Sequence, residues 1–307
     1  MLEGAQHHGV DAGPAPSRTR RDYRGVMVVA VTGASGKLGR RIAARLADAD
    51  VEQLLVARDP SRLPELPRAE RRGPAEYGDA PAMRRALEGA DTLVLVSGNL
   101  SGRRLEEHAT AIDAARAAGV DRVLYVSLLG AAPDATYLNA RDHWQIERHL
   151  AGAGIAHVVL RAGIYAAMLP GLAVDGVVRG PAGDGRVSLV THDDLAEVAA
   201  ALVVDRADGP GSADVSDVLE VTGPEALTLD EATARIASVT GRPLRFEHET
   251  PEDGFAWRSR RGDATGAGID GWISWHLAIA RGRVEVVTDV VERVTGHPAR
   301  PVEDAHR

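Results

Sequence analysis

Residues 28–39 carry the feature that most limits what this chain can fold into. Their sequence, VVAVTGASGKLG, is a β-branched apolar run followed directly by a glycine-rich turn, and a helical pattern begins at once over 38–47. A strand, a glycine turn and a helix N-terminus in succession present free backbone N–H groups to an anion. We expect Gly33 to allow the tight turn, Gly36 to let a pyrophosphate come close, and Gly39 to let the helix pack near the strand. The motif indicates a dinucleotide site, with a purely structural turn as the alternative.

Apolar runs alternate with helical patterns after this turn. The central run, TLVLVS at 92–97, has no polar alternation, as expected for a strand buried on both faces. Strand–helix alternation predicts an α/β fold with a Rossmann-type doubly wound parallel sheet, whose strands all end at one ligand-binding edge. We expect strands over 53–58, 92–97, 123–127 and 155–160, and helices over 82–88, 105–118 and 140–153.

The chain divides into three expected parts. Residues 1–25 are rich in Gly, Pro, Arg and His without periodicity, which predicts a disordered N-terminal tail, and Met27 could be the natural start. Residues 26–165 are expected to form the NAD(P)-binding Rossmann domain. Residues 166–307 are expected to form a smaller C-terminal α/β substrate lobe, with some segments returning to the Rossmann core.

Motifs in the second half are mostly caps. A strand is expected over 187–190, followed by a helix to about 204 with Thr191 or Asp193 as its N-cap. Thr228 and Glu231 have the spacing of a capping box. Asp193 and Asp194 are interpreted as part of a helix cap rather than a catalytic carboxylate pair.

Composition excludes several function classes. The net charge of −8 argues against a general nucleic-acid surface, and no apolar run approaches the roughly 20 residues of a membrane span. The chain has no cysteine, so disulfides, thiol catalysis and cysteine-bound metals are excluded. The lack of cysteine fits a cytoplasmic protein. The histidines show no metal-ligand spacing, so no metal site is expected.

The last residue of the expected second strand is charged, and its charge bears on the choice between NAD and NADP(H). Arg58 lies 22 residues after Gly36, where an acidic residue would bind a ribose 2′-OH and a basic one suits a 2′-phosphate. Lys37, inside the glycine turn, adds a second positive charge. These residues favour NADP(H) over NAD, although an exposed arginine at a strand end is the alternative.

Two segments are expected to contact the cofactor. The first is the turn itself, and the second follows the central strand, where small residues let the backbone pass under the nicotinamide ribose unless they form a plain loop. The predicted cofactor-binding residues in these segments are Gly33, Ala34, Ser35, Gly36, Lys37, Leu38 and Gly39, then Ser97, Gly98 and Asn99.

Further motifs, in combination, resemble the NmrA-like branch of the atypical short-chain dehydrogenase/reductases, and within it the bacterial NADPH:quinone reductases. The resemblance runs from about Val28 to Arg245. It is carried by the glycine motif, Arg58, EYGD at 76–79, LEGAD at 87–91, AGV at 118–120, YVSLLG at 125–130, LRAGIY at 160–165, PAGDGR at 181–186 and THDD at 191–194.

The resemblance implies which residues line the nicotinamide half of the cofactor. Segments 162–167 and 189–194 would lie along it, with Gly163 and Tyr165 among the contacts. A core tyrosine after a strand is the alternative for Tyr165. Ser127 stands where the superfamily has a substrate-orienting serine, or is a strand-end serine bonded to backbone.

The catalytic positions depart from the superfamily pattern. That pattern has a tyrosine, a lysine four residues later and a glutamate four residues after that; here these positions are Asn139, His143 and Glu147. The usual proton donor is therefore missing. Tyr137 and Arg141 have the right spacing, but that register moves them off Glu147. His143 is the catalytic candidate because its unperturbed pKa of about 6.5 suits a proton or a hydrogen bond; a histidine packed on the helix is the alternative.

Two functions from different classes remain. The first is an NAD(P)H-dependent oxidoreductase that transfers hydride from NADPH to a quinone or similar small-molecule acceptor, which can take its proton from solvent. The second is a non-catalytic NADP(H)-binding redox sensor, whose cleft beside the nicotinamide would be filled. A sugar-nucleotide epimerase is disfavoured because it needs the missing tyrosine and lysine. Neither nucleic acid nor membrane is expected as a partner, the oligomeric state is open, and packing is favoured over pocket lining for Trp257, Trp272 and Trp275.

Overall fold

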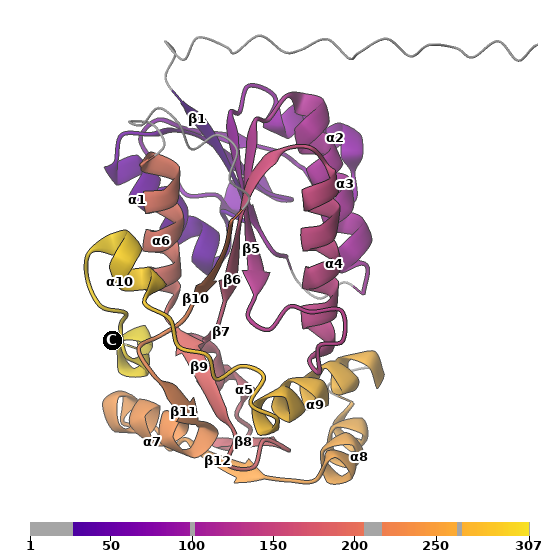
Figure 1. Cartoon of the computed structure of the whole chain (residues 1–307), viewed down its shortest axis with the longest axis vertical. Helices are drawn as coiled ribbons and strands as arrows, with labels where there is room; N and C mark the ends of the chain where they lie inside the picture. The colour runs from indigo at the N-terminus through magenta and orange to yellow at the C-terminus, as the bar shows by residue number, and fades with distance from the viewer. Residues whose placement is uncertain (1–26, 99–101, 206–216, 263–265, 307) are drawn as a thin grey trace, which may run out of the picture.

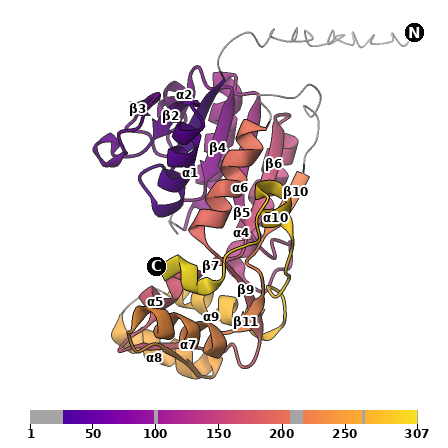
Figure 2. The same cartoon turned by 90° about the vertical axis from the view of Figure 1, so that its left-hand side faces the viewer.

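A computed structural model describes residues 27–98, 102–205, 217–262 and 266–306 of the chain. Figures 1 and 2 show a large sheet covered by helices on both faces and, at the end of its strands, a smaller lobe built from later parts of the chain.

Seven strands form the large sheet, and all of its strand pairs are parallel. Their order is β10-β6-β5-β4-β1-β2-β3. The order reverses between β1 and β4, because β2 and β3 lie on one side and β5 and β6 on the other. This switch point leaves a crevice at the C-terminal ends of β1 and β4, where open α/β sheets bind ligands. The strands are β1 Val28–Thr32, β2 Glu52–Val56, β3 Ala69–Arg72, β4 Thr92–Val96, β5 Arg122–Leu128, β6 Ala156–Ala162 and β10 Asp217–Val221.

Two helical layers cover the sheet, and each closes its own hydrophobic core (Figure 1). One layer packs apolar side chains such as Ile42 and Leu195 against the sheet, and the other packs Met83, Ile112 and Ile146 against the opposite face. The first layer is α1 Lys37–Asp48, α6 His192–Val204 and α10 Val290–Thr295; the second is α2 Ala80–Leu87, α3 Arg104–Ala118 and α4 Leu138–Gly152.

The smaller lobe has a third core around Leu229, Phe246 and Trp275. A three-stranded sheet of order β11-β9-β7 and a two-stranded sheet of β12 and β8 supply its strands. The strands are β7 Ile164–Tyr165, β8 Val177–Gly180, β9 Arg186–Val190, β11 Ala226–Thr228 and β12 Arg245–His248. The helices are α5 Leu169–Leu172, α7 Leu229–Thr240, α8 Pro251–Arg261 and α9 Gly266–Ala280, and the short 3₁₀ segments are η1 Pro60–Arg62, η2 Ala166–Met168 and η3 Val302–His306.

The expected doubly wound α/β fold is confirmed, with differences at the ends of elements. The second strand ends at Val56 rather than Arg58, so Arg58 follows the strand. The strand β3 was not expected, because its sequence, AERR, has no apolar pattern. Thr191 rather than Asp193 caps α6, since its hydroxyl accepts a hydrogen bond from the backbone N–H of Asp194 at 3.0 Å.

The capping box of α7 is present as expected, with bonds in both directions between Thr228 and Glu231. The boundary expected at residue 165 stays a prediction, although β10 joins the large sheet and α6 and α10 cover its face. The expected N-terminal tail lies outside the described residues.

Candidate functional site

The glycine turn connects β1 to α1 at the switch point of the sheet. Gly33 has a φ of +63°, in the left-handed region, and the backbone N–H of Gly36 donates to the Gly33 carbonyl at 2.8 Å. A Cβ at Gly39 would lie 2.4 Å from the Gly33 oxygen, so only glycine lets α1 pack this close to the turn. Gly33 and Gly39 therefore have the conformational roles that the sequence predicted.

The first turn of α1 has the features of an anion site. Its N-cap, Gly36, makes no side-chain capping bond, and the turn contains no acidic residue. The N–H groups of this turn are thus free for a ligand, and the helix dipole favours a negative one. Ala34 and Leu38 are buried in the core, so of these two only the backbone could face a ligand, whereas Lys37 is exposed. A cradle of backbone N–H groups that a side chain would obstruct fits a pyrophosphate.

Two exposed cations flank this turn. Lys37 begins α1, and Arg58 follows β2, which is the parallel neighbour of β1, so both lie at the same edge of the sheet. Neither forms an ion pair with a residue of the described chain. The pair is available for a phosphate.

The segment after β4 is tied to α3 through a buried arginine. The Ser97 hydroxyl accepts from Nη1 of Arg104 at 3.0 Å. A Cβ at Gly98 would lie 3.6 Å from the Tyr77 ring, an ordinary contact, so packing does not require glycine there. Asn99 lies outside the described residues.

Gly163 has a packing role of its own. A Cβ there would lie 2.6 Å from the Ser188 carbonyl oxygen, and its N–H donates to the Val221 carbonyl at 2.9 Å. The glycine lets β9 and β10 approach, which explains it without a ligand. Its neighbour Tyr165 stacks on His192 with ring centroids 4.2 Å apart, and burial raises the pKa of Tyr165.

The imidazole of His143 lies in a buried polar cluster, with both ring nitrogens engaged. Its Nε2 is 2.8 Å from Nη1 of Arg104, and its Nδ1 is 2.7 Å from the Tyr125 hydroxyl. A guanidinium only donates, so Nε2 accepts and Nδ1 carries the proton of the neutral ring. Burial and then the charge of Arg104 hold the pKa of His143 well below its ordinary value. These contacts favour a positioning role, and proton transfer by His143 stays a prediction.

A second histidine extends the cluster. His108 is 1% exposed, its Nδ1 bonds to the Arg104 carbonyl at 2.8 Å, and its ring packs edge-on against Tyr77 at 5.1 Å. Burial lowers its pKa to about 4. Among the described residues its Nε2 is buried without a partner. Sequence reasoning gave no reason to single out Arg104 or His108, because nothing local marks a residue that is buried by distant parts of the chain.

Ser127 is committed to a different interaction from those expected. Its hydroxyl donates to the Glu147 carboxylate at 2.6 Å, and Nη2 of Arg161 contacts the same carboxylate at 2.7 Å. The side chain therefore faces a buried ion pair rather than a backbone carbonyl.

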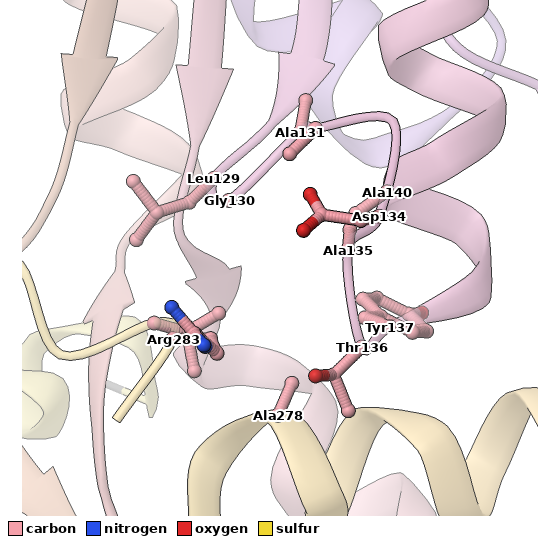
Figure 3. Close-up of a pocket in the computed structure, with 12 residues that line it drawn as sticks. Leu129, Gly130, Ala131, Asp134, Ala135, Thr136, Tyr137, Ala140, Ala278 and Arg283 are labelled. Atoms are coloured by element: carbon pink, nitrogen blue, oxygen red, sulfur yellow. The ribbon is translucent and has the colours of Figure 1, made fainter. Parts of the chain in front are cut away.

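A cavity of about 250 Å³ lies beyond the end of β5 (Figure 3). The segment after β5, the start of α4, the end of α9 and residues 283–284 form its walls. Figure 3 shows Asp134 and Arg283 on opposite sides of the opening. Its lining consists of Leu129, Gly130, Ala131, Ala132, Asp134, Ala135, Thr136, Tyr137, Ala140, Ala278, Arg283 and Val284.

Tyr137 is the only aromatic side chain in that wall. Its hydroxyl oxygen accepts from Nδ2 of Asn139 at 2.7 Å. Arg141, the partner suggested by spacing, is exposed and donates to the Ala135 carbonyl at 2.7 Å. The structure thus brings Tyr137 to the cavity with Asn139 and not with Arg141.

The expected packing of the tryptophans holds for Trp275, which is 4% exposed in the third core. Trp272 is partly buried against the same core and packs edge-on against Trp275, with ring centroids 5.7 Å apart. None of the three tryptophans lines the cavity.

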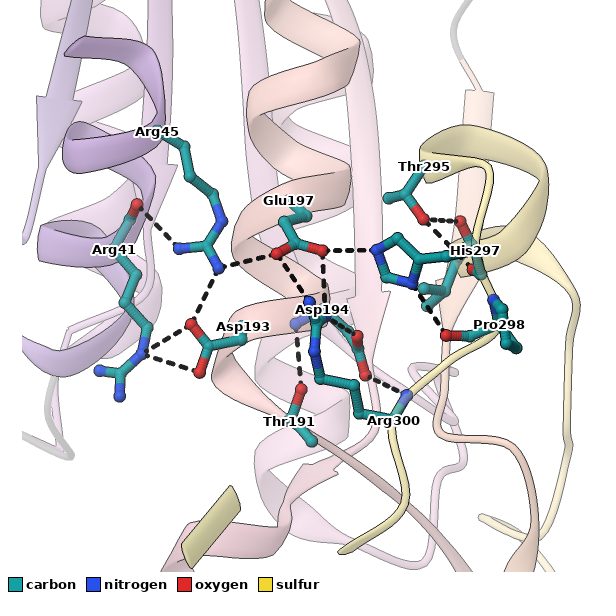
Figure 4. A network of polar contacts seen from close by, with 11 residues as sticks. Arg41, Arg45, Thr191, Asp193, Asp194, Glu197, Thr295, His297, Pro298 and Arg300 are labelled. Atoms are coloured by element: carbon teal, nitrogen blue, oxygen red, sulfur yellow. Dashed lines mark hydrogen bonds and ion pairs between the residues drawn. The ribbon is translucent and has the colours of Figure 1, made fainter. Parts of the chain in front are cut away.

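Charged side chains form a network on the opposite helical layer (Figure 4). Asp194, Glu197 and His297 lie close enough together to hold a metal ion. Nη2 of Arg45 contacts Glu197 at 2.9 Å, and the guanidinium of Arg300 contacts Glu197 at 3.0 Å and also pairs with Asp194. Because arginines already neutralise the carboxylates, the network holds the C-terminal segment to α6 and α1 rather than providing a metal centre.

The C-terminal segment η3 packs against η2 and α7. Burial lowers the pKa of His306, opposed by the nearby Ala166 backbone and assisted by the charge of Lys37. The last described residue thus lies near the segment 162–167, which the family resemblance places along the nicotinamide half of the cofactor. No helix within the described ranges is long and apolar enough to cross a membrane.

The glycine cradle, the paired cations and the switch point define a dinucleotide-binding α/β protein. A family model described as NAD(P)H-binding matches residues 33–206, and the chain belongs to that family. Quinone oxidoreductase 2 of Escherichia coli is 34% identical over 74% of this chain and 79% of that protein. A reductase of (4-alkanoyl-5-oxo-2,5-dihydrofuran-3-yl)methyl phosphate from Streptomyces griseus is 33% identical over 90% of this chain and 96% of that protein.

Solved structures agree with this assignment. The E. coli quinone oxidoreductase 2 complexed with NADPH has a TM-score of 0.76 at 27% identity, covering 91% of this chain and 98% of that one. NmrA, a negative transcriptional regulator, shares the fold with a TM-score of 0.71 at 16% identity, covering 91% of this chain and 94% of that one. The resemblance to the NmrA-like proteins is confirmed, and the chain is an NAD(P)H-binding oxidoreductase.

Proposed function

We propose that the chain transfers hydride from NADPH to a quinone or a similarly flat, electron-poor small molecule. The observation that carries this proposal is the cavity at the same sheet edge as the glycine cradle. The relatives named quinone oxidoreductase and furanone phosphate reductase support an acceptor of this kind. The bound nicotinamide supplies the hydride, so the protein's part is binding, orientation and control of charge.

The phosphates would be held by backbone and by exposed cations. In this proposal the backbone N–H groups of 33–39 bind the pyrophosphate, and Lys37 with Arg58 binds the 2′-phosphate, which makes NADPH the preferred cofactor. Ser97, Gly98, Asn99, Gly163 and Tyr165 would lie along the nicotinamide half.

In this proposal the groups around His143 orient the nicotinamide half of the site. Arg104, held by His143 and Ser97, is a fixed positive charge behind the cavity wall formed by Tyr137 and Ala140. A positive charge there stabilises negative charge that develops on the acceptor oxygen. We propose His143 as the residue that holds this guanidinium in place.

The sensor alternative predicts a filled cleft, whereas a cavity is present, which favours turnover. We also propose that the protein acts in the cytoplasm on a small-molecule acceptor and does not bind nucleic acid.

The test is oxidation of NADPH by the purified protein, followed at 340 nm, with a panel of quinones. Oxidation is expected with at least some of them. NADPH binding with no oxidation by any quinone or related acceptor would overturn the enzyme proposal in favour of the sensor.

A further inference from the structure

We propose that Tyr137 gives a proton to the reduced acceptor from the wall of the cavity beyond β5. This inference rests on the proposed function, because the proton is needed only if an acceptor is reduced there. The position is two residues before the one that the superfamily pattern assigns to a tyrosine, and Asn139 occupies the pattern position.

The hydrogen bonds of Tyr137 leave its proton available. Asn139 donates to the phenolic oxygen, so that bond does not use the Tyr137 hydroxyl hydrogen. Within the described ranges no side chain or carbonyl accepts this hydrogen. Tyr137 lines the cavity, and we infer that its hydroxyl hydrogen is donated to an acceptor oxygen bound there.

Two groups stabilise the phenolate that remains after the proton has left. The Asn139 amide strengthens its bond to a charged oxygen. Arg104 is 8% exposed, and its charge acts on both Asp142 and Tyr137. Burial raises the pKa of Tyr137, and the Asn139 bond and the charge of Arg104 oppose that rise.

The arginine belongs to the same site as the tyrosine. Arg104 contacts His143, which lies one turn of α4 after Asn139 and Ala140, and Ala140 lines the cavity beside Tyr137. Arg104 also has a buried Nε without a partner in the described chain. A buried cation stabilises negative charge that forms near it, and proton loss by Tyr137 places such charge there.

The proposed step balances. A hydride from NADPH, which is two electrons and a proton, converts a quinone into the hydroquinone monoanion. The Tyr137 O–H bond then breaks while a new O–H bond forms on the product oxygen, and Tyr137 is left as phenolate. A proton from solvent restores the phenol, so no other oxidant or reductant is needed.

Two acceptors separate proton donation from mere packing. A quinone needs a proton, whereas a triarylmethyl cation dye such as crystal violet takes hydride on carbon and gives a neutral product without one. Tyr137→Phe is expected to lower kcat with the quinone by about 100-fold, as for loss of a general acid. It should leave the rate with the dye and the Kd for NADPH within about twofold of wild type. Equal losses with both acceptors would overturn the proposal.

A binding measurement tests the same contact without turnover. 4-Nitrophenolate, whose absorbance near 400 nm reports its ionisation, stands in for the anionic product in the presence of NADP⁺. Tyr137→Phe should weaken its binding about tenfold, the worth of a hydrogen bond to a charged oxygen. Unchanged binding would contradict the proposal even if quinone reduction itself were never observed.

Two further variants complete the design. Arg148→Gln, at an exposed position farther along α4, is the control, because it removes a charge from the same helix away from the cavity, and it should change none of these values. Asn139→Ala keeps the tyrosine and removes the amide, and it should slow quinone reduction several-fold without slowing dye reduction. If Tyr137→Phe does not fold, an Asn139→Ala variant that slows both acceptors equally would overturn the proposal.

Discussion

The glycine turn and the side chains around α4 lie at the same edge of one sheet, yet they are built in opposite ways. The turn is a continuous stretch of backbone, and its geometry follows from three glycines in seven residues. The α4 side combines Arg104 from α3, Tyr125 from β5 and His143 from α4 through buried side-chain contacts. A backbone site is specified locally and binds what most members of a fold bind. A side-chain site is specified by tertiary contacts and can differ between relatives.

The largest effect is expected for Gly39→Ala in the glycine turn. The added Cβ would lie 2.4 Å from the Gly33 carbonyl, so the turn must shift. We expect NADPH binding to weaken about 100-fold, which is roughly 2.7 kcal/mol, measured by fluorescence titration. Gly152→Ala, at the end of α4 with open space around it, is the control and should bind normally. Normal binding by Gly39→Ala would show that the turn is not the cofactor cradle.

The stability of the protein at low pH tests the buried polar cluster around α4. His108 has a folded pKa of about 4, below its unfolded value near 6.5, so the unfolded chain binds more protons between these values. Its contribution to stability is complete above about pH 6.5 and is lost as the pH falls toward 4, by about 1.4 kcal/mol per pH unit at most. In urea unfolding between pH 4.5 and 7.5, His108→Gln should reduce this dependence on pH. At pH 7.5 the difference in unfolding free energy between wild type and variant reports lost packing and not lost titration. Parallel profiles of unfolding free energy against pH for the two proteins would contradict the prediction.

The preference for NADPH over NADH tests the surroundings of the glycine turn, with a smaller expected effect on binding. Arg58→Asp should raise the Kd for NADPH about tenfold while leaving that for NADH nearly unchanged, because it removes a cation and adds an anion near the 2′-phosphate. Arg116→Asp, at the end of α3 on the opposite edge of the sheet, makes the same charge change as a control. If both variants shift the ratio of the two Kd values equally, the effect is overall charge and not a phosphate contact.

The smallest effect is expected in the charged network behind α1. The carbonyl of Pro298 and the carboxylate of Glu197 raise the pKa of His297, whose side chain is 38% exposed. Its contribution is therefore present below about pH 6.5 and is lost as the pH rises through the raised folded value. Because solvent screens the pair, His297→Ala should lower stability by under about 1 kcal/mol at pH 6 and by less at pH 8, measured by thermal unfolding. A larger loss of stability at pH 8 than at pH 6 would contradict the raised pKa of His297.

Prediction from sequence worked where a pattern was local. The strands with continuous apolar runs and the capping box at Thr228 were predictable because each depends on residues within a few positions. The strand β3 was not, since its polar AERR pairs only along one edge of the sheet.

The site divides in the same way. The turn and its neighbouring cations were visible in the sequence, but the burial of Arg104 and the engagement of both His143 nitrogens depend on α3 packing against α4. Gly163 matched a family motif while having a steric reason of its own, the approach of β9. A motif match therefore identified the position but not the cause.

The position of His306 has a practical consequence for handling the protein. A purification tag at the C-terminus would begin two positions after His306, which lies near Ala166 and Lys37 and so close to segments expected to bind the cofactor. Met27 precedes β1 and lies at the other edge of the sheet, away from the glycine turn. A tag placed ahead of β1 is the choice that leaves cofactor titrations interpretable.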